Sequence, residues 1–122
     1  MIVGNIDDGL HPRIVLEITG AKSSATLPML VDTGFDVDVA LHFDFADQLG
    51  LEIDDLALFE YANGQSQEDL ISHVRVNWHG QWQEFEVVLS DDRETSIGTR
   101  LLKGCLLNMD FIQNIVTIDK SQ

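Results

Sequence analysis

Cysteine, proline and basic residues are all scarce in this 122-residue sequence. It contains one cysteine, two prolines, and seven lysines and arginines against 21 aspartates and glutamates. The lone Cys105 cannot form a disulfide within the chain. It lies in an apolar run, where a cysteine usually behaves as a small core residue. We therefore expect a fold held by a hydrophobic core alone, which a chain of this length can build.

The shortage of basic residues gives the chain a formal net charge of -14. Such a surface repels the phosphates of nucleic acids and anionic membranes, so we expect neither as a partner. No apolar run approaches the ~18 residues that span a bilayer, and the first eight residues lack the basic start and apolar core of a signal peptide. We expect a cytoplasmic protein.

The overall composition is that of a folded globular protein. Hydrophobic residues make up 44% of the chain and charged residues 23%, which differs from the composition of disordered tails. No internal repeat, low-complexity segment or linker divides the sequence. We therefore expect a single domain over residues 1–122.

Alternating apolar residues predict that strands dominate this chain. Pro28 favours an edge position or an irregular start for the second strand, because proline cannot donate to a sheet ladder. Turn residues separate the runs, with Asn63-Gly64 and His79-Gly80 as hairpin signals. The expected strands cover residues 13–19, 25–31, 37–41, 74–78, 85–89 and 115–118.

Two segments have a helical pattern instead. Residues 43–51 predict a short helix with Asp44 as its N-cap and Gly50 at its end. Thr99–Lys103 is a second candidate. The predicted fold class is therefore all-β, mainly antiparallel, with one or two short helices.

The segment with the clearest chemical meaning is Asp32-Thr33-Gly34, which follows the apolar run before it. A carboxylate at the end of a buried strand is costly unless hydrogen bonds hold it. Gly34 allows the backbone to approach and donate to the Asp32 carboxylate, and the Thr33 hydroxyl can bond across a pair of such turns. Alternatively, Asp32 is an ordinary turn aspartate satisfied by its own backbone.

A single aspartate cannot carry out peptide hydrolysis of the acid-base type. That chemistry needs one ionised carboxylate to take a proton from water and one protonated carboxyl to polarise the scissile carbonyl. The sequence contains no second Asp-Thr-Gly or Asp-Ser-Gly triplet. A homodimer whose twofold axis passes through the site supplies the second Asp32.

Other kinds of site have little support. The four histidines are scattered without metal-ligand spacing, so we interpret them as isolated surface residues: His11, His42, His73 and His79. Asp36 and Asp38 lack the glycine and distal glutamate of a known calcium loop, and a solvated strand face explains them better. No phosphate-binding loop or serine-hydrolase motif is present. We expect neither a metal nor a cofactor.

The sequence resembles the retroviral-like (retropepsin-like) aspartyl proteases, in particular small bacterial members with an Asp-Thr-Gly-Phe motif. Asp32-Thr33-Gly34 matches the catalytic triplet of that family, and Asn63-Gly64 lies where the family has its flap. Ile97-Gly98, followed by Leu101-Leu102, resembles the segment that packs beneath the catalytic turn. Leu106 to Ile118 resembles the closing strands.

This resemblance implies a homodimeric acid protease barrel that cleaves a peptide or protein substrate. It implies Asp32, Thr33 and Gly34 as the catalytic residues, and Asn63 and Gly64 at a flap over the substrate. Tyr61, near that flap, is a further candidate for substrate contact. Ser96 departs from the family pattern, in which a second apolar residue precedes Ile-Gly, and the flap lacks a glycine-rich tip.

Two other functions remain open at this point. A catalytically inactive peptide-binding module would keep the dimeric fold and hold an extended peptide without cutting it. A small acidic β-domain that stays monomeric would share only the motif. Loss of activity on replacing Asp32 separates the enzyme from the binding module, and the oligomeric state separates both from the monomer.

Overall fold

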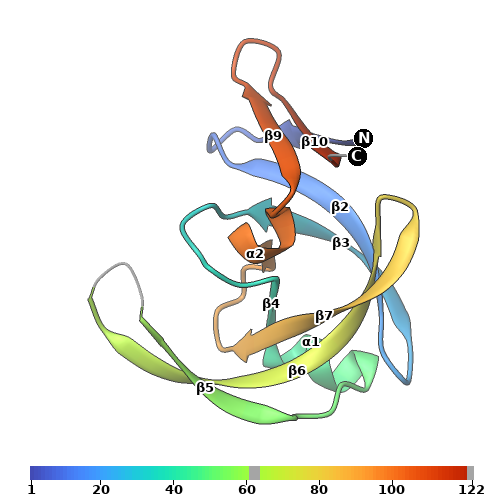
Figure 1. Ribbon diagram of the computed structural model, residues 1–122, viewed down its shortest axis with the longest axis vertical. Helices are drawn as coiled ribbons and strands as arrows, with labels where there is room; N and C mark the ends of the chain where they lie inside the picture. Colours follow the sequence, from blue (N-terminus) through green and yellow to red (C-terminus); the bar gives the residue numbers. More distant parts are fainter. Residues whose placement is uncertain (61–63, 121–122) are drawn as a thin grey trace.

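The computed structural model describes residues 1–60 and 64–120 as a mostly β structure with two short helices (Figure 1). The predicted fold class is confirmed. No helix among the described residues is long and apolar enough to cross a membrane. The elements are β1 (Ile2–Ile6), β2 (Pro12–Thr19), β3 (Ser24–Val31), β4 (Val39–His42), α1 (Phe43–Leu49), β5 (Asp55–Glu60), β6 (Ser66–Trp78), β7 (Gln81–Ser90), β8 (Ser96–Ile97), α2 (Thr99–Leu102), β9 (Cys105–Asp110) and β10 (Ile115–Lys120).

The strands form one sheet that closes on itself into a barrel. Within the described residues, the order is β5-β6-β7-β4-β8-β3-β2-β1-β10-β9, and an additional pairing of β6 with β2 closes six of these strands. The β3–β8 and β4–β7 pairings are parallel, whereas every other described pairing is antiparallel. β5 and β9 lie at the two ends of this order.

Alternation along the strands places the core inside the barrel. Ile14, Leu16 and Ile18 of β2 are almost completely buried, while Val15 between them is 62% exposed. The same period buries Val74 of β6, together with the alternate residues that follow it. The hairpin predicted at residues 79–80 is present, because β6 and β7 pair on either side of it.

β4 differs from its prediction. It begins at Val39, and all four of its residues are buried, so the expected solvated face is wrong. The physical reason is its position, because β4 lies between β7 and β8 in the barrel. Asp36 and Asp38 precede the strand and lie in the connection from β3, so their assignment to a strand face is also wrong.

Pro28 lies within β3 without breaking it. Its carbonyl accepts the Thr95 hydroxyl, so the backbone of Pro28 points toward β8. The β8 ladder reaches only Leu30 and Val31, which leaves no ladder bond for a proline N–H to make. On the side of β3 that faces β8, Pro28 therefore lies where the strand has no ladder partner, which agrees with the predicted edge position.

Helix α1 lies close to its prediction, but with a different N-cap. His42 is the N-cap, and its Nδ1 accepts from the Asp44 backbone N–H at 3.1 Å. Asp44 lies instead in the first turn. Gly50 ends the helix as expected, with φ of 76° in the left-handed region. Because His42 is 9% exposed, its expected surface position is wrong.

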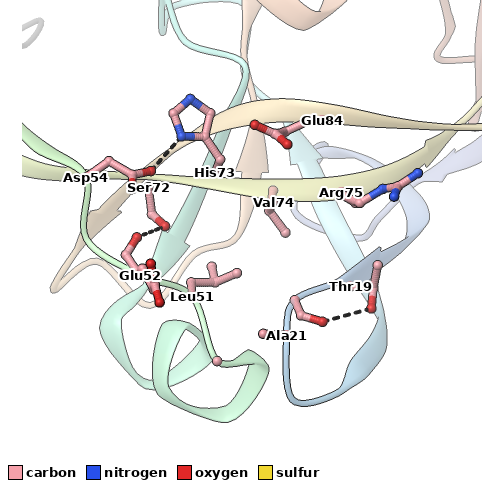
Figure 2. Close-up of a pocket in the computed structure, with 12 residues that line it drawn as sticks. Thr19, Ala21, Leu51, Glu52, Asp54, Ser72, His73, Val74, Arg75 and Glu84 are labelled. Atoms are coloured by element: carbon pink, nitrogen blue, oxygen red, sulfur yellow. Dashed lines mark hydrogen bonds and ion pairs between the residues drawn. The ribbon is translucent and has the colours of Figure 1, made fainter.

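The connection from α1 to β5 is fastened to β6 (Figure 2). The Asp54 N–H donates to the Ile71 carbonyl at 2.8 Å. The Ser72 hydroxyl donates to the Glu52 carbonyl, and the His73 Nδ1 and Asp54 Oδ2 atoms are 2.6 Å apart. The hydrogen bond with Asp54 raises the pKa of His73 above its ordinary 6.5. β5 therefore starts from an anchored point.

Close backbone packing at Gly98 joins β8 and α2 to the segment after β3. Gly98 is buried, and a Cβ there would come within 2.4 Å of the carbonyl oxygens of Phe35 and Val37. The Gly98 N–H also donates to the Asp38 carbonyl at 3.1 Å. Only glycine fits this contact without moving the backbone.

We predict that Gly98→Ala destabilises the protein by about 1–3 kcal/mol, because the added methyl group has to displace backbone atoms. Gly80→Ala is the control: nothing lies within 4 Å of a Cβ there, and only the left-handed backbone costs about 1 kcal/mol. Urea unfolding at matched protein concentration measures both variants. Equal unfolding midpoints for Gly98→Ala and the unchanged protein would contradict the packing argument.

The raised pKa of His73 predicts a pH-dependent contribution to stability. The Asp54 pair stabilises the fold below the ordinary histidine pKa of 6.5, and the contribution is lost as pH rises through the raised value. Both side chains are nearly half exposed, so we expect ~0.2–1 kcal/mol. Asp54→Asn should be less stable than the unchanged protein at about pH 5.5 and equal to it at about pH 8.5. A difference independent of pH in urea unfolding would argue against this pair.

Candidate active site

The chain reaches Asp32 directly from the buried end of β3. The Asp32 N–H donates to the Ile97 carbonyl of β8 at 2.9 Å, and the Asp32 carbonyl accepts from the Phe35 N–H at 3.3 Å. Val31, one residue earlier, pairs with Ile97 in the β3–β8 ladder. The backbone of Asp32 is therefore fixed from both sides, with the residue itself half-buried.

The Asp32 carboxylate is oriented by its own turn. Its Oδ1 accepts from the Gly34 N–H at 3.0 Å. A Cβ on Gly34 would lie 3.3 Å from that same oxygen, which is a tight contact. Thr33 and Gly34 are both exposed. The turn thus presents a held carboxylate and an exposed hydroxyl at the surface of one chain.

Helix α2 supports the turn from the far side. The Thr99 N–H donates to the Phe35 carbonyl at 2.9 Å, and the Arg100 N–H donates to the Val37 carbonyl at 3.2 Å. The Thr99 hydroxyl donates to the Asp36 carboxylate at 3.2 Å. These bonds, with the Gly98 contact, place the Ile97-Gly98 segment against the turn as the sequence predicts. They fix residues 35–37 relative to Asp32.

The two acidic residues after the turn each have a hydrogen-bond donor within the fold. Asp36 accepts from Thr99, and Asp38 Oδ2 accepts from the Glu86 N–H at 3.4 Å. Across residues 1–60 and 64–120, no three His, Cys, Asp or Glu side chains gather in a way that would hold a metal ion. Both carboxylates therefore help to hold the connection between β3 and β4.

A small apolar cluster connects the turn at Asp32 to strand β6. Val37, Ile71 and Val88 are buried together, and Phe35 packs against them. Ile71 belongs to β6, and Val88 belongs to β7. Sequence reasoning placed Val37 and Val88 in strands and gave Ile71 no element, and nothing in the linear pattern shows that three separate segments meet. Strands β6 and β7 and the segment after Asp32 therefore share one packing unit.

The predicted flap is the hairpin formed by β5 and β6. Gly64 lies at its end, exposed, with φ of 80°, and no atom lies within 4 Å of the position that a Cβ would take there. Tyr61 and Asn63 lie outside the described residues. The ends of β5 and β6 nearest this tip lie on the same side of the molecule as the connection from β3 to β4 (Figure 1). The structure therefore brings together three of the predicted site residues in one turn, namely Asp32, Thr33 and Gly34. Gly64 lies in the separate β5–β6 hairpin.

A pocket of about 600 Å³ lies elsewhere, between the β2–β3 hairpin, the α1–β5 connection and β6 (Figure 2). Leu51 and Val74 give it an apolar wall, and the His73–Asp54 pair lies on its rim. The predicted site residues that the structure describes are Asp32, Thr33, Gly34 and Gly64, and none of these four lines the pocket. The pocket is therefore separate from the turn at Asp32.

Some supporting residues had no clear signal in the sequence. Thr99 and Arg100 matter through their backbone N–H groups, which any residue except proline supplies. Thr99 also bonds to Asp36, a contact across 63 positions of the chain. Ile97-Gly98 was found because a resemblance pointed to it, whereas the bonds of α2 required the structure.

Comparisons of sequence identify no relative, since no family model and no curated protein matches the chain. Comparison of structures finds similar proteins. A retropepsin-like aspartic protease from Rickettsia conorii matches with a TM-score of 0.68 and 19% identity, over 98% of this chain and 89% of that chain. The match therefore includes nearly the whole of both proteins.

Two further solved structures are similar. EIAV protease, complexed with the inhibitor HBY-793, matches with a TM-score of 0.60 and 19% identity, over 76% of this chain and 86% of that one. The retroviral protease-like domain of Ddi1 from Leishmania major matches with a TM-score of 0.51 and 20% identity, over 88% of each chain. Together with the closed barrel and the turn at Asp32, these likenesses show that the chain has the retropepsin-like fold.

Proposed function

We propose that this chain is an aspartic endopeptidase whose catalytic dyad consists of Asp32 from each subunit of a homodimer. The observation that carries the proposal is the turn at Asp32, where the Gly34 N–H holds the carboxylate at 3.0 Å within a retropepsin-like fold. Thr33 and Gly34 are exposed in a single chain. This leaves the turn open to a second copy.

A second copy is needed because one chain supplies one such turn. The sequence has a single Asp-Thr-Gly triplet and no Asp-Ser-Gly. A twofold axis beside the turn would place two identical carboxylates face to face. In that arrangement the Thr33 hydroxyl of each subunit is positioned to hydrogen-bond across the axis, which holds the two turns together.

The proposed reaction follows from the coupling of two close carboxylates. At a separation of ~3 Å they cannot both ionise, so they share one proton. The ionised carboxylate takes a proton from water as the water oxygen bonds to the peptide carbon, and the protonated one donates to the carbonyl oxygen. The C–N bond of the resulting diol then breaks, the nitrogen leaves as an amine after accepting a proton, and the other product is a carboxylic acid.

Substrate would lie in extended form between the dyad and the flap. Tyr61, Asn63 and Gly64 are the proposed contacts on the flap side, and the peptide would be held as an added strand by main-chain hydrogen bonds. The net charge of -14 per chain slows the approach of acidic peptides, so neutral and basic peptides should associate faster.

The decisive variant is Asp32→Asn, which keeps an oxygen to accept from Gly34 and removes the ionisable group. We expect it to lose peptide cleavage by at least ~100-fold, because no general base or acid remains in the dyad. Asp36→Asn, the same chemical change four positions later, should still cleave. Mass spectrometry of a diverse peptide mixture between about pH 4 and pH 7 measures all three proteins.

Equal cleavage by Asp32→Asn and the unchanged protein would refute the dyad. Absence of cleavage by any of the proteins, with peptide binding retained, would refute catalysis and identify a retropepsin-like module that holds peptides without cutting them. Binding is measured on the same peptides by fluorescence anisotropy. Asp36→Asn shows whether a loss of cleavage is specific to Asp32 or follows from the loss of any carboxylate near the turn.

The shared site also predicts how cleavage depends on protein concentration. Below the dissociation constant of the dimer, the rate should rise with about the square of the chain concentration, because two chains make one site. Above that constant it should become linear. Initial rates over a dilution series test this, and a rate proportional to concentration down to a demonstrated monomer would mean that one chain cleaves alone.

A further inference from the structure

The pocket between the β2–β3 hairpin, the α1–β5 connection and β6 has walls that the fold holds in place (Figure 2). A Cβ on Gly20 would come within 2.3 Å of the Leu49 carbonyl oxygen. A Cβ on Gly50 would come within 2.7 Å of the Lys22 Cγ atom. The Lys22 N–H also donates to the Leu49 carbonyl at 2.9 Å. The β2–β3 hairpin is therefore packed directly against the end of α1.

The opposite wall is hydrogen-bonded in place as well. The Asp54 N–H bonds to the Ile71 carbonyl. The Ser72 hydroxyl bonds to the Glu52 carbonyl, which joins the α1–β5 connection to β6. The pocket volume of about 600 Å³ lies within the ~300–1,000 Å³ typical of ligand pockets, which are usually formed before the ligand arrives. This pocket has the size and the fixed walls of such a site.

The interior of the pocket offers apolar surface. Val74 of β6 is buried, and Leu51 packs against the same core. Figure 2 shows both side chains directed into the space between β6 and the two loops. The lining hydroxyl groups of Thr19 and Ser72 already donate to backbone carbonyls. An occupant is therefore recognised inside the pocket mainly through its apolar groups.

Five charged residues line the pocket, and only two of them pair with each other. His73 Nδ1 and Asp54 Oδ2 lie 2.6 Å apart. No ion pair among the described residues includes the other three, which are Glu52, Arg75 and Glu84. Glu84 stands opposite Arg75 in the β6–β7 ladder. The exposed Glu52 and Arg75 side chains can therefore still contact a charged ligand.

These two charges have opposite signs and lie on opposite sides of the pocket. In Figure 2, Leu51 and Val74 lie between Glu52 and Arg75. A carboxylate attracts an ammonium group, and a guanidinium holds a carboxylate through two parallel N–H bonds. The pocket thus presents an anionic, an apolar and a cationic contact in that order.

We propose that this pocket is a second binding site, and that its ligand is a short peptide with a free amino group and a free carboxylate. The amino group lies at Glu52 and the carboxylate at Arg75. Apolar side chains of the peptide cover the wall formed by Leu51 and Val74. The site is separate from the turn at Asp32, so it binds such a peptide whether or not the chain cleaves peptide bonds.

The spacing of the two charges favours a peptide over a single amino acid. A compact pocket of about 600 Å³ is ~10 Å wide, which ~3 extended residues span at 3.3–3.6 Å each. The amino group and carboxylate of a free amino acid share one carbon atom, so it reaches only one of the two charges. The net charge of -14 also repels a ligand that has a carboxylate without an ammonium group.

NMR titration of the isotope-labelled full chain with the tripeptide Leu-Ala-Leu tests the site. We expect saturable shifts at the amides of residues 51–54 and 72–75, while residues 32–34 report any binding at the proposed active site. N-acetyl-Leu-Ala-Leu lacks the ammonium group and Leu-Ala-Leu amide lacks the carboxylate, so each should have a dissociation constant ~2–5-fold higher. Gly-Gly-Gly and free leucine should bind at least ~10-fold more weakly, because they bury less apolar surface.

Two substitutions assign each charged group of the peptide to its partner. Glu52→Gln should weaken Leu-Ala-Leu and its amide ~2–5-fold and leave the acetylated peptide unchanged. Arg75→Gln should weaken Leu-Ala-Leu and the acetylated peptide and leave the amide unchanged. Both side chains are exposed, so we expect both variants to fold. Asp91→Asn is the control, since it removes a negative charge from an exposed residue outside the pocket.

The crossed pattern of losses, with Asp91→Asn unchanged, would support the site even if no peptide were cleaved. Absence of shifts at residues 51–54 and 72–75 up to about 10 mM peptide would overturn it. Shifts confined to residues 32–34 would overturn it as well, even for an active peptidase. Equal binding of Gly-Gly-Gly or leucine, or an equal loss in Asp91→Asn and Glu52→Gln, would refute the assigned contacts.

Discussion

The structure depends on close backbone contact between β8 and the turn that follows β3. The Asp32 N–H bonds to Ile97, and Gly98 lies so close to the carbonyls of Phe35 and Val37 that no Cβ fits. Because α2 begins directly after Gly98, its first N–H groups bond to the same turn. The position of Asp32 and the start of α2 are therefore set by one packed junction.

That junction fixes the backbone of Asp32 in a single chain. The N–H and the carbonyl of Asp32 are both hydrogen-bonded, and the next two residues, Thr33 and Gly34, are exposed. A charged group at the end of a core strand is usually either paired or functional. In our account its counterpart is the same group of a second copy.

Local patterns in the sequence predicted most of the fold, and contacts between distant segments account for what was missed. Alternation located the strands, and Gly50 marked the end of α1. His42 was assigned to the surface because its role as N-cap depends on the backbone at Asp44. β1 was not predicted, since Val3 is exposed and Gly4 is required by close approach to the carbonyl of Arg13, which no local pattern reveals. At the site, the Asp-Thr-Gly motif identified the turn, but the support from α2 and the cluster of Val37, Ile71 and Val88 depends on tertiary packing.

The most direct test of a shared dyad is to mix chains. A fixed amount of the unchanged protein is incubated with a tenfold excess of Asp32→Asn, at a concentration where both dimerise and exchange, and cleavage is then measured. Random pairing would leave about one in eleven of the unchanged chains with an unchanged partner. The account predicts that the rate falls to about a tenth. A rate that stays constant would contradict it, because each active site would then belong to one chain alone.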